Sequence, residues 1–181
     1  MRADRHRRGR AWDEPLARSG DATLEAGNDR VAEKDTELQV AVREITIGDA
    51  EPAATLSGEL GYPVSTAAME RRIEKLHDHK DHVVYVACVS NAVVGWIDVG
   101  LVHHLQAEPY GEIGGLIVAD AFRSCGIGRI LVAEAEKWVA EKGIANILVR
   151  SRISREAAHR FYIREGYSRT KTSAVFTKSL G

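Results

Sequence analysis

The clearest structural signal in the chain is the segment Gly114-Gly-Leu-Ile-Val-Ala-Asp-Ala-Phe-Arg-Ser-Cys-Gly-Ile-Gly128-Arg-Ile-Leu-Val-Ala-Glu-Ala-Glu-Lys-Trp138. An apolar run leads into a loop that contains glycine, and an amphipathic stretch follows, which predicts a strand, a loop and a helix. The first N–H groups of a helix have no internal partners and carry partial positive charge, so they form an anion site. Gly126 and Gly128 lack Cβ atoms, so we expect a diphosphate to approach this loop closely.

The residues after the loop narrow the class of phosphate ligand. A P-loop would continue with Gly-Lys-Ser/Thr, but Arg129 follows Gly128. A dinucleotide-binding loop would carry a third glycine where Leu131 stands, and it would follow the first strand of a parallel unit. Three strand-like runs precede this loop, so both nucleotide-binding interpretations are disfavoured. A pair of glycines taken alone is often only a tight turn.

Periodicity in the rest of the chain predicts a mixed sheet with helices packed on it, of class α/β (α+β). Alternating or apolar runs predict strands at 38–45, 83–89, 93–102, 112–118, 147–149 and, as one strand or a pair, 167–180. Capping residues and apolar stripes predict helices from Asp49 to Leu60, from Ser65 or Thr66 to Leu76, and at 128–142 and 154–164. The dipeptide Ser90-Asn91 is typical of a hairpin turn.

The first 37 residues differ from the rest because they are dense in charge and poor in large apolar residues. Such a segment buries too little surface to offset the entropy lost on ordering. We therefore expect residues 1–37 to be a flexible charged extension. Residues 38–181 have the length of one domain with a single core.

Composition excludes several classes of function. The formal net charge of −1 gives no reason to expect nucleic-acid binding, and no apolar run approaches the ~20 residues of a membrane helix. No signal-peptide pattern is visible, so we expect a cytoplasmic location. Cys88 and Cys125 are too few for a disulfide framework. His77, His79 and His82 fall in a polar helix end and turn without matching ligands, so we expect no metal site.

The pattern Arg123-x-x-Gly126-x-Gly128 after an apolar strand resembles the acetyl-CoA motif of the GNAT N-acetyltransferase superfamily. The resemblance extends over residues 38–180 and implies acetyl-CoA as co-substrate. It also implies a single-domain GNAT-like fold, a mixed and mostly antiparallel sheet of roughly 6–7 strands with about four helices, splayed between the fourth and fifth strands. In that family the strand before the loop carries a bulge and splays from its neighbour. By position, the pantetheine arm would pair with the backbone of Leu116, Ile117 and Val118. The residues implied for the pyrophosphate are Arg123, Ser124, Cys125, Gly126, Ile127, Gly128 and Arg129.

A second signature lies downstream. The run Arg155-Glu-Ala-Ala-His-Arg-Phe-Tyr162-Ile-Arg-Glu-Gly-Tyr167 resembles the family's Asn-x-x-Ala-x-x-Phe-Tyr-x-x-x-Gly-Phe/Tyr. Arg155 replaces the Asn that contacts the cofactor arm in the family, so we expect Arg155 to reach a phosphate or solvent instead. The residue pattern alone predicts an amphipathic helix with Phe161 and Tyr162 in the core. The two interpretations are compatible if the Tyr162 ring lies in the core and its hydroxyl lies at the thiol of coenzyme A.

Acetyl transfer to an amine requires a base, a donor for the oxyanion, an acid for the thiolate and the alignment of both substrates. For the base, the offset of Glu112 from Arg123 is similar to that of the glutamate in the histone acetyltransferase branch. His103 and His104, in the expected turn before the same strand, are alternatives because imidazole changes protonation near neutral pH. We expect Tyr110 to line the same acceptor cleft.

The resemblance implies Tyr162 as the acid and the backbone N–H of Val118 as the oxyanion donor. Cys125 falls at a helix N-terminus, where thiols become more acidic, so a covalent acetyl-cysteine intermediate is an alternative. The family transfers the acetyl group directly, which makes Cys125 a filler of the loop.

These inferences predict an acetyl-CoA-dependent N-acetyltransferase that acts directly on a primary amine of a small molecule or a protein. The alternative is a non-catalytic regulatory module that binds an acyl-CoA, and Arg155 in place of Asn is its main support. Glu59, Asp78, Glu108 and Glu112 would favour a cationic amine if they lined the acceptor mouth, but scattered surface acids would give the same pattern. The resemblance allows a homodimer, although the sequence locates no interface.

Overall fold

The computed structural model describes residues 38–181, so the expected extension over residues 1–37 lies outside the described part of the chain. The predicted elements up to α4 are present, with ends that differ by a few residues. The elements in chain order are β1 (Val40–Glu44), α1 (Ala50–Leu60), α2 (Thr66–His77), β2 (His82–Val89), β3 (Ala92–His104), β4 (Ala107–Val118), α3 (Ile127–Glu141), β5 (Ile147–Val149) and α4 (Glu156–Arg164), with 3-10 turns at Ile47–Asp49 and Asp120–Phe122.

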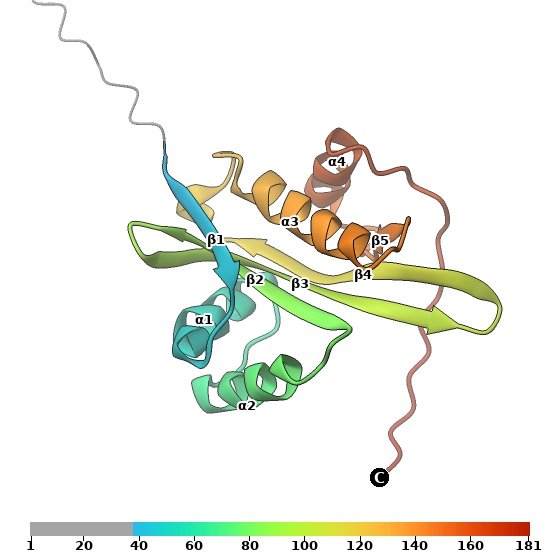
Figure 1. The fold of residues 1–181 in the computed structure, drawn as a ribbon, viewed down its shortest axis with the longest axis horizontal. Coiled ribbons are helices and arrows are strands. Elements are labelled where there is room, and N and C mark those ends of the chain that lie inside the picture. Colours follow the sequence, from blue (N-terminus) through green and yellow to red (C-terminus); the bar gives the residue numbers. More distant parts are fainter. Residues whose placement is uncertain (1–37) are drawn as a thin grey trace, which may run out of the picture. The chain divides into compact units, whose positions relative to one another are not determined.

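One mixed sheet, with strand order β1-β2-β3-β4-β5, forms the centre of this unit. Strands β1 to β4 pair antiparallel, and β5 pairs parallel to β4. A parallel pair needs a crossover connection, and α3 supplies it. Helices α1 and α2 cover one face of the sheet, called here the α1–α2 face, while α3 and α4 lie on the other (Figure 1).

The main core lies between the sheet and α3, because the strand and helix periodicities present apolar side chains to one another. Ile97 and Val99 of β3 and Ile113 of β4 share this core with Leu131 and Val132 of α3, and all five are at most 2% exposed. Burial of each such side chain contributes roughly 1.5–3 kcal/mol. A smaller buried cluster, formed by residues of α1 and α2, lies on the opposite face.

Two local predictions are confirmed by backbone geometry. Ser90 and Asn91 have φ angles of 49° and 67°. Positive φ at both central residues is the requirement of a tight type I′ hairpin, so the predicted turn is correct. The Ser65 hydroxyl accepts a hydrogen bond from the Ala68 N–H at 3.3 Å and caps α2 as predicted.

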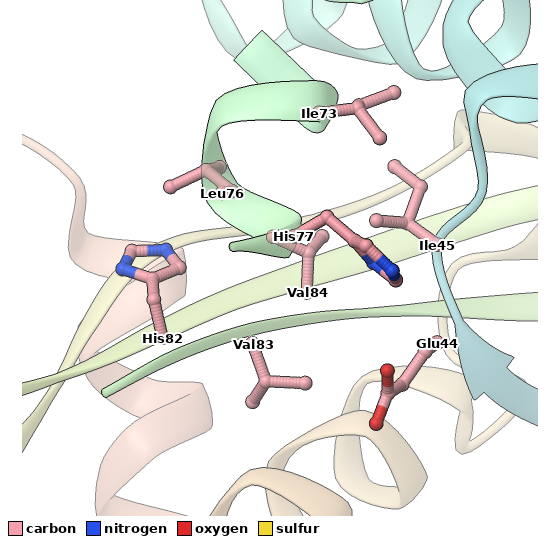
Figure 2. A pocket seen from close by; sticks show the side chains of 8 residues that line it. All are labelled: Glu44, Ile45, Ile73, Leu76, His77, His82, Val83 and Val84. Carbon is pink, nitrogen blue, oxygen red and sulfur yellow. The ribbon is translucent and has the colours of Figure 1, made fainter. Parts of the chain in front are cut away.

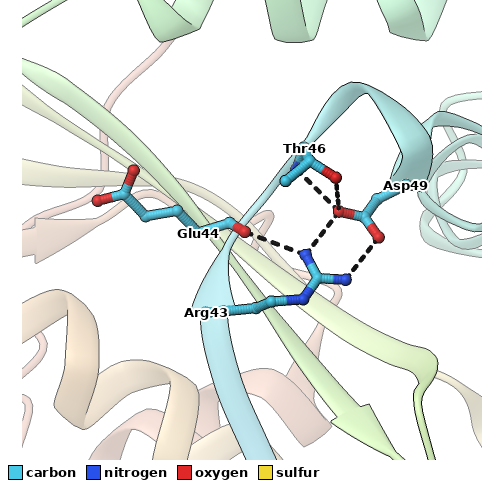
Figure 3. A network of polar contacts seen from close by, with 4 residues as sticks. All are labelled: Arg43, Glu44, Thr46 and Asp49. Carbon is cyan, nitrogen blue, oxygen red and sulfur yellow. Dashed lines mark hydrogen bonds and ion pairs between the residues drawn. The ribbon is translucent and has the colours of Figure 1, made fainter.

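Asp49 precedes α1, but its side chain does not cap that helix. The buried carboxylate accepts hydrogen bonds from the Arg43 guanidinium at 2.7 and 2.8 Å and from the N–H and hydroxyl of Thr46 at 2.8 Å (Figure 3). The bonds from Arg43, followed by those from Thr46, lower the pKa of Asp49 to about 2. The network therefore fastens the end of β1 to the start of α1.

The sheet has five strands, so the expected roughly 6–7 strands are not matched. Within residues 38–181 no strand follows α4, and the prediction of strands over 167–180 is wrong: this stretch is drawn as an extended trace (Figure 1). Residues 168–173 read Ser-Arg-Thr-Lys-Thr-Ser and offer no large apolar side chain to a sheet. Val175 and Phe176 beyond them are 81% and 92% exposed, so they pack against no layer.

Candidate active site

β4 contains a β-bulge at the point where its pairing with β5 ends. Asp98 of β3 pairs with Gly115, but the next pair joins Val99 to Ile113, so Gly114 is an extra residue. β5 pairs with β4 only over Gly111–Ile113. Beyond the bulge, the edge of β4 that faced β5 has no partner strand, and backbone groups of this stretch can pair with an extended ligand.

The bulge is covered on the α1–α2 face by an aromatic ring. A Cβ on Gly115 would lie 2.7 Å from the Trp96 ring and 3.8 Å from Leu60 at the end of α1, so only glycine permits this packing. The indole Nε1–H of Trp96 is buried and has no acceptor among the described residues. A buried donor without a partner is rare in proteins, and here it lies beside the free end of β4.

The loop after β4 leads directly into the N-terminus of α3. Ser124 and Gly126 have φ angles of 64° and 82°, which bend the backbone tightly before the helix begins at Ile127. A Cβ on Gly126 would meet nothing within 4 Å, so the approach to the helix N-terminus is open. Ser124, Cys125 and Arg129 are exposed around it. This arrangement fits a pyrophosphate.

Arg123 has partners inside the loop itself. Its guanidinium pairs with Asp120 at 2.5 Å, and its Nε–H donates to the Val118 carbonyl at 3.2 Å. These contacts tie the end of β4 to the 3-10 turn that follows. The first role of Arg123 in the structure is thus to hold the loop in shape.

Gly128 has a packing role that sequence reasoning did not anticipate. A Cβ on Gly128 would lie 3.2 Å from the Phe161 ring and 4.0 Å from Val118. The Phe161 ring therefore occupies the space beside the first turn of α3 and seats α4 there. The open approach to the backbone belongs to Gly126, and the close packing of α4 belongs to Gly128.

Tyr162 follows Phe161 on α4 and is packed among aromatic rings. Its ring meets Phe161 at a centroid distance of 5.1 Å and Tyr167 at 5.4 Å, both edge to face. Desolvation by burial raises the pKa of Tyr162 to about 12. The phenol therefore keeps its proton at neutral pH, as a general acid must.

The segment between β5 and α4 contacts the end of α1. The Arg155 guanidinium donates to the carbonyl of Leu60 at 2.7 Å, and Leu60 is the last residue of α1, where carbonyls lack helical partners. The Arg152 guanidinium lies 5.7 Å from the Tyr62 ring centre and donates to its hydroxyl at 3.3 Å. Arg155 thus has a carbonyl partner that the sequence did not indicate.

Glu112 belongs to a polar group at the β4–β5 pairing. Its carboxylate forms an ion pair with Arg150 at 2.5 Å, and Arg150 also donates to the Tyr110 hydroxyl at 3.5 Å. The same hydroxyl lies 3.1 Å from His104 Nε2. The structure therefore brings Glu112, Tyr110 and His104 together, as expected, and adds Arg150, which engages one carboxylate oxygen of Glu112.

The position of the two expected histidines differs from the sequence interpretation. β3 extends to His104 and β4 begins at Ala107, so His103 and His104 lie at the end of a strand and not in the turn. His103 is exposed, and the hydrogen bonds that join His104, Tyr110 and Arg150 do not include it.

One polar pair near the bulge was missed by sequence reasoning. His82 Nε2 lies 2.5 Å from Asp98 Oδ1, and Asp98 Oδ2 lies 3.3 Å from the place of a Cβ on Gly114. The sequence signal for this pair was Asp98, a charged residue inside the apolar run 93–102. The sequence pattern placed His82 in a polar turn, whereas the structure places it at the start of β2.

Residues 38–181 contain no cluster of three or more His, Cys, Asp or Glu side chains arranged to hold a metal ion. They also contain no helix with the length and apolar character needed to cross a membrane.

Comparison with known proteins identifies relatives of one kind. The family model described as the acetyltransferase (GNAT) family matches residues 50–167. Aminoalkylphosphonate N-acetyltransferase of Salmonella typhimurium is 38% identical over 96 residues, which are 52% of this chain and 61% of the relative, so the match spans less than two thirds of that relative. Aminoglycoside N(6')-acetyltransferase type 1 of Stenotrophomonas maltophilia is 26% identical over 144 residues, 77% of this chain and 93% of the relative.

A solved structure shares the fold. Aminoglycoside N-acetyltransferase AAC(6')-Iy in complex with CoA superposes with a TM-score of 0.70, covering 78% of this chain and 95% of that one, at 16% identity. At this identity the likeness concerns the fold alone.

Proposed function

Because the chain belongs to the acetyltransferase (GNAT) family, we propose that it transfers an acetyl group from acetyl-CoA directly to a primary amine. The observation that carries the proposal is the bulged end of β4, which has a free backbone edge and leads into the open N-terminus of α3. An extended pantetheine arm suits the edge, and a pyrophosphate suits the helix N-terminus.

The donor would occupy the residues named from the sequence. The arm would pair with the backbone of Leu116, Ile117 and Val118, beyond the bulge. The pyrophosphate would lie on the exposed N–H groups from Ser124 to Arg129, with Arg123 bracing the loop through Asp120. Binding of this kind depends on backbone donors, which is why an open Gly126 matters more than any one side chain.

The reaction centre would lie between the free end of β4 and α4. The N–H of Val118 would donate to the thioester oxygen as charge develops on it. The buried phenol of Tyr162 would protonate the departing thiolate. Glu112, with Arg150, Tyr110 and His104, would line the acceptor side, where the carboxylate attracts an ammonium group.

For the acceptor we propose a small amine that also carries an anionic group. Arg152 presents an exposed guanidinium beside the Tyr62 hydroxyl, and Arg150 and Arg155 lie in the same segment after β5. A guanidinium matches phosphonate, phosphate or carboxylate oxygens in a bidentate manner. The name of one relative concerns aminoalkylphosphonates, which combine an amine with an anion, and that of the other concerns polycationic aminoglycosides. The arginines favour the first class.

The experiment follows thiol release from acetyl-CoA with matched acceptors: an aminoalkylphosphonate, the plain alkylamine of the same length, a peptide amine and an aminoglycoside. We expect the fastest release with the aminoalkylphosphonate and at least a tenfold lower rate in Tyr162→Phe. Arg152→Gln should raise KM for the aminoalkylphosphonate about tenfold and leave the plain alkylamine unchanged. Arg72→Gln, an exposed arginine of α2, is the matched control.

Two results would argue against the proposal. Tight binding of acetyl-CoA without thiol release for any amine would favour the regulatory module considered above. Equal KM values for the phosphonate and the plain amine, unaffected by Arg152→Gln, would contradict the proposed anionic class of acceptor. The proposal of acetyl transfer would not be affected.

A further inference from the structure

Asp98 and His82 form a polar pair on the α1–α2 face of the sheet that the proposed function has not used. His82 Nε2 lies 2.5 Å from Asp98 Oδ1, and the side chains are 26% and 32% exposed for His82 and Asp98 respectively. Ile97 and Val99, the sequence neighbours of Asp98, are fully buried on the other face. A half-buried carboxylate in the middle strand of a sheet costs desolvation and requires a compensating interaction or a function.

Asp98 lies at the bulge of β4. It pairs with Gly115, and its Oδ2 lies 3.3 Å from the place of a Cβ on Gly114. Gly114 has no side chain to cover the carboxylate, so this oxygen remains directed at the point where β4 loses β5. That point is where the proposed thioester and acceptor amine meet.

His82 links the carboxylate to a pocket. A Cβ on Gly100 would lie 2.8 Å from His82 Nδ1, so the ring rests against the backbone of β3. The ring also lines a pocket whose wall includes His77 of α2 and Glu44 of β1 (Figure 2). Figure 2 shows His82 at the edge of this pocket, beside the end of α2. The imidazole, itself partly exposed, therefore lies between Asp98 and solvent.

Glu112 has a different partner. Gly100 pairs with His82 on one side and with Glu112 on the other, so the two polar groups lie in one row across the sheet. Glu112 is held by the guanidinium of Arg150, which always carries its proton. An imidazole has two ring nitrogens, so it can accept a proton from Asp98 at one and release a proton from the other, which a guanidinium cannot do.

We propose that Asp98 is the catalytic base that receives the proton of the acceptor ammonium, and that His82 is a positioning residue that holds Asp98 and passes the proton to solvent. The assignment rests on the proposed acetyl transfer. The ammonium gives one proton to Asp98, and the amine lone pair forms the C–N bond as the C–S bond breaks. The thiolate takes the Tyr162 proton, and the second proton leaving the nitrogen restores the phenol.

The test compares wild type with Asp98→Asn, His82→Gln and Glu112→Gln, measuring thiol release between about pH 6 and pH 10. We expect kcat/KM of Asp98→Asn to fall about 10²–10³-fold at neutral pH. The deficit should shrink above the pKa of the acceptor, because the amine then arrives without its extra proton. A poorly basic amine should be acetylated at nearly equal rates by Asp98→Asn and wild type. His82→Gln, which keeps an N–H donor for Asp98, should lose about tenfold and alter the pH profile.

Each outcome decides the assignment. An Asp98→Asn enzyme that keeps half of its kcat/KM, or a deficit that is constant with pH, overturns the base and leaves the proposed function standing. A shrinking deficit in Glu112→Gln instead identifies Glu112 as the base. A wild type that binds acetyl-CoA but acetylates no amine removes the proposed function and this assignment together. If Asp98→Asn fails to fold by circular dichroism, the pH profile of His82→Gln decides, and an unaltered profile overturns the assignment.

Discussion

Two single residues show how their surroundings set a protonation state. Burial among aromatic rings raises the pKa of Tyr162 to about 12, which keeps a proton on the phenol at neutral pH. Hydrogen bonds from Arg43 lower the pKa of Asp49 to about 2, which keeps the carboxylate charged in a buried position. The first effect suits the acid role that we propose for Tyr162, and the second stabilises the fold.

The Asp49 network predicts a pH-dependent change in stability. Asp49→Asn leaves the Thr46 N–H and the Arg43 guanidinium without charged acceptors, so the free energy of unfolding at pH 7 should fall by about 1–3 kcal/mol. Because the folded-state pKa lies below the ordinary 3.8, this contribution is present above about pH 4 and is lost as the pH falls towards 2. The gap between wild type and variant should therefore narrow in acid.

Urea unfolding at neutral and acid pH measures this gap. Glu44→Gln is the control, since Glu44 is exposed and contacts Arg43 only through its backbone oxygen. A gap that stays constant down to pH 2 would mean that the carboxylate charge does not contribute.

Sequence reasoning reached some of these residues and not others. Tyr162 and the loop from Arg123 to Gly128 each stand at fixed spacings within a local motif, so a single sequence is enough to propose them. His82 and Asp98 lie on one hairpin whose register shifts between Ala87 and Cys88, and Glu112 and Arg150 are 38 residues apart, so periodicity cannot pair them. Arg155 illustrates the same limit, because its partner Leu60 lies 95 residues away.

At the scale of elements, β4 combines pairing, packing and a free edge in one strand. Its first part pairs with both neighbours, and its last part pairs with β3 alone. Hairpins and helix starts were predictable because Ser90-Asn91 and Ser65 act through local geometry. The resemblance implied a bulge in this strand, and Gly114-Gly115 inside a strand is an independent signal for one.

The packing of β4 gives a second prediction. In Gly115→Ala the new methyl group would lie 2.7 Å from the Trp96 ring, so strand or ring must shift, and stability should fall by about 1–3 kcal/mol. Gly58→Ala is the matched control, because a Cβ on that residue of α1 meets nothing within 4 Å and alanine favours helix. Chemical denaturation measures both variants.

The ring itself offers a further check. If the contact with Trp96 causes the loss, the cost of Gly115→Ala should be smaller in a Trp96→Leu background. An equal cost in both backgrounds would locate the strain elsewhere in β4.

At the scale of residues 38–181 as a whole, the alternation of strands and helices was predictable and the number of strands was not. The residue pattern led to the expectation of one strand or a pair over 167–180, and the resemblance implied a total of roughly 6–7 strands. The residues that follow α4 lack the apolar content to hold a place in the sheet. Local composition therefore decides the extent of the sheet here.

The exposed C-terminal residues give a third prediction. A chain truncated after Tyr167 should keep its free energy of unfolding within about 0.5 kcal/mol, because residues 168–181 are exposed throughout. Phe161→Ala, which removes a ring packed on Gly128, is the contrasting variant and should lose about 3 kcal/mol. Thermal or urea unfolding compares the two. A truncation that costs more than about 2 kcal/mol would mean that the segment forms sheet structure in solution.

The extra residue at Gly114 also shifts the phase of β4. Before it, odd-numbered positions such as Gly111 and Ile113 face α3; after it, even-numbered positions such as Leu116 and Val118 pack on that side. The residues that face α3 are therefore odd-numbered before the bulge and even-numbered after it. Gly114 and Gly115 both point to the α1–α2 face, so deleting Gly114 would restore one regular alternation that keeps Leu116 and Val118 against α3. The deletion would remove only the bulge, so the inserted residue shapes the open end of the strand and is not needed for the apolar support of α3.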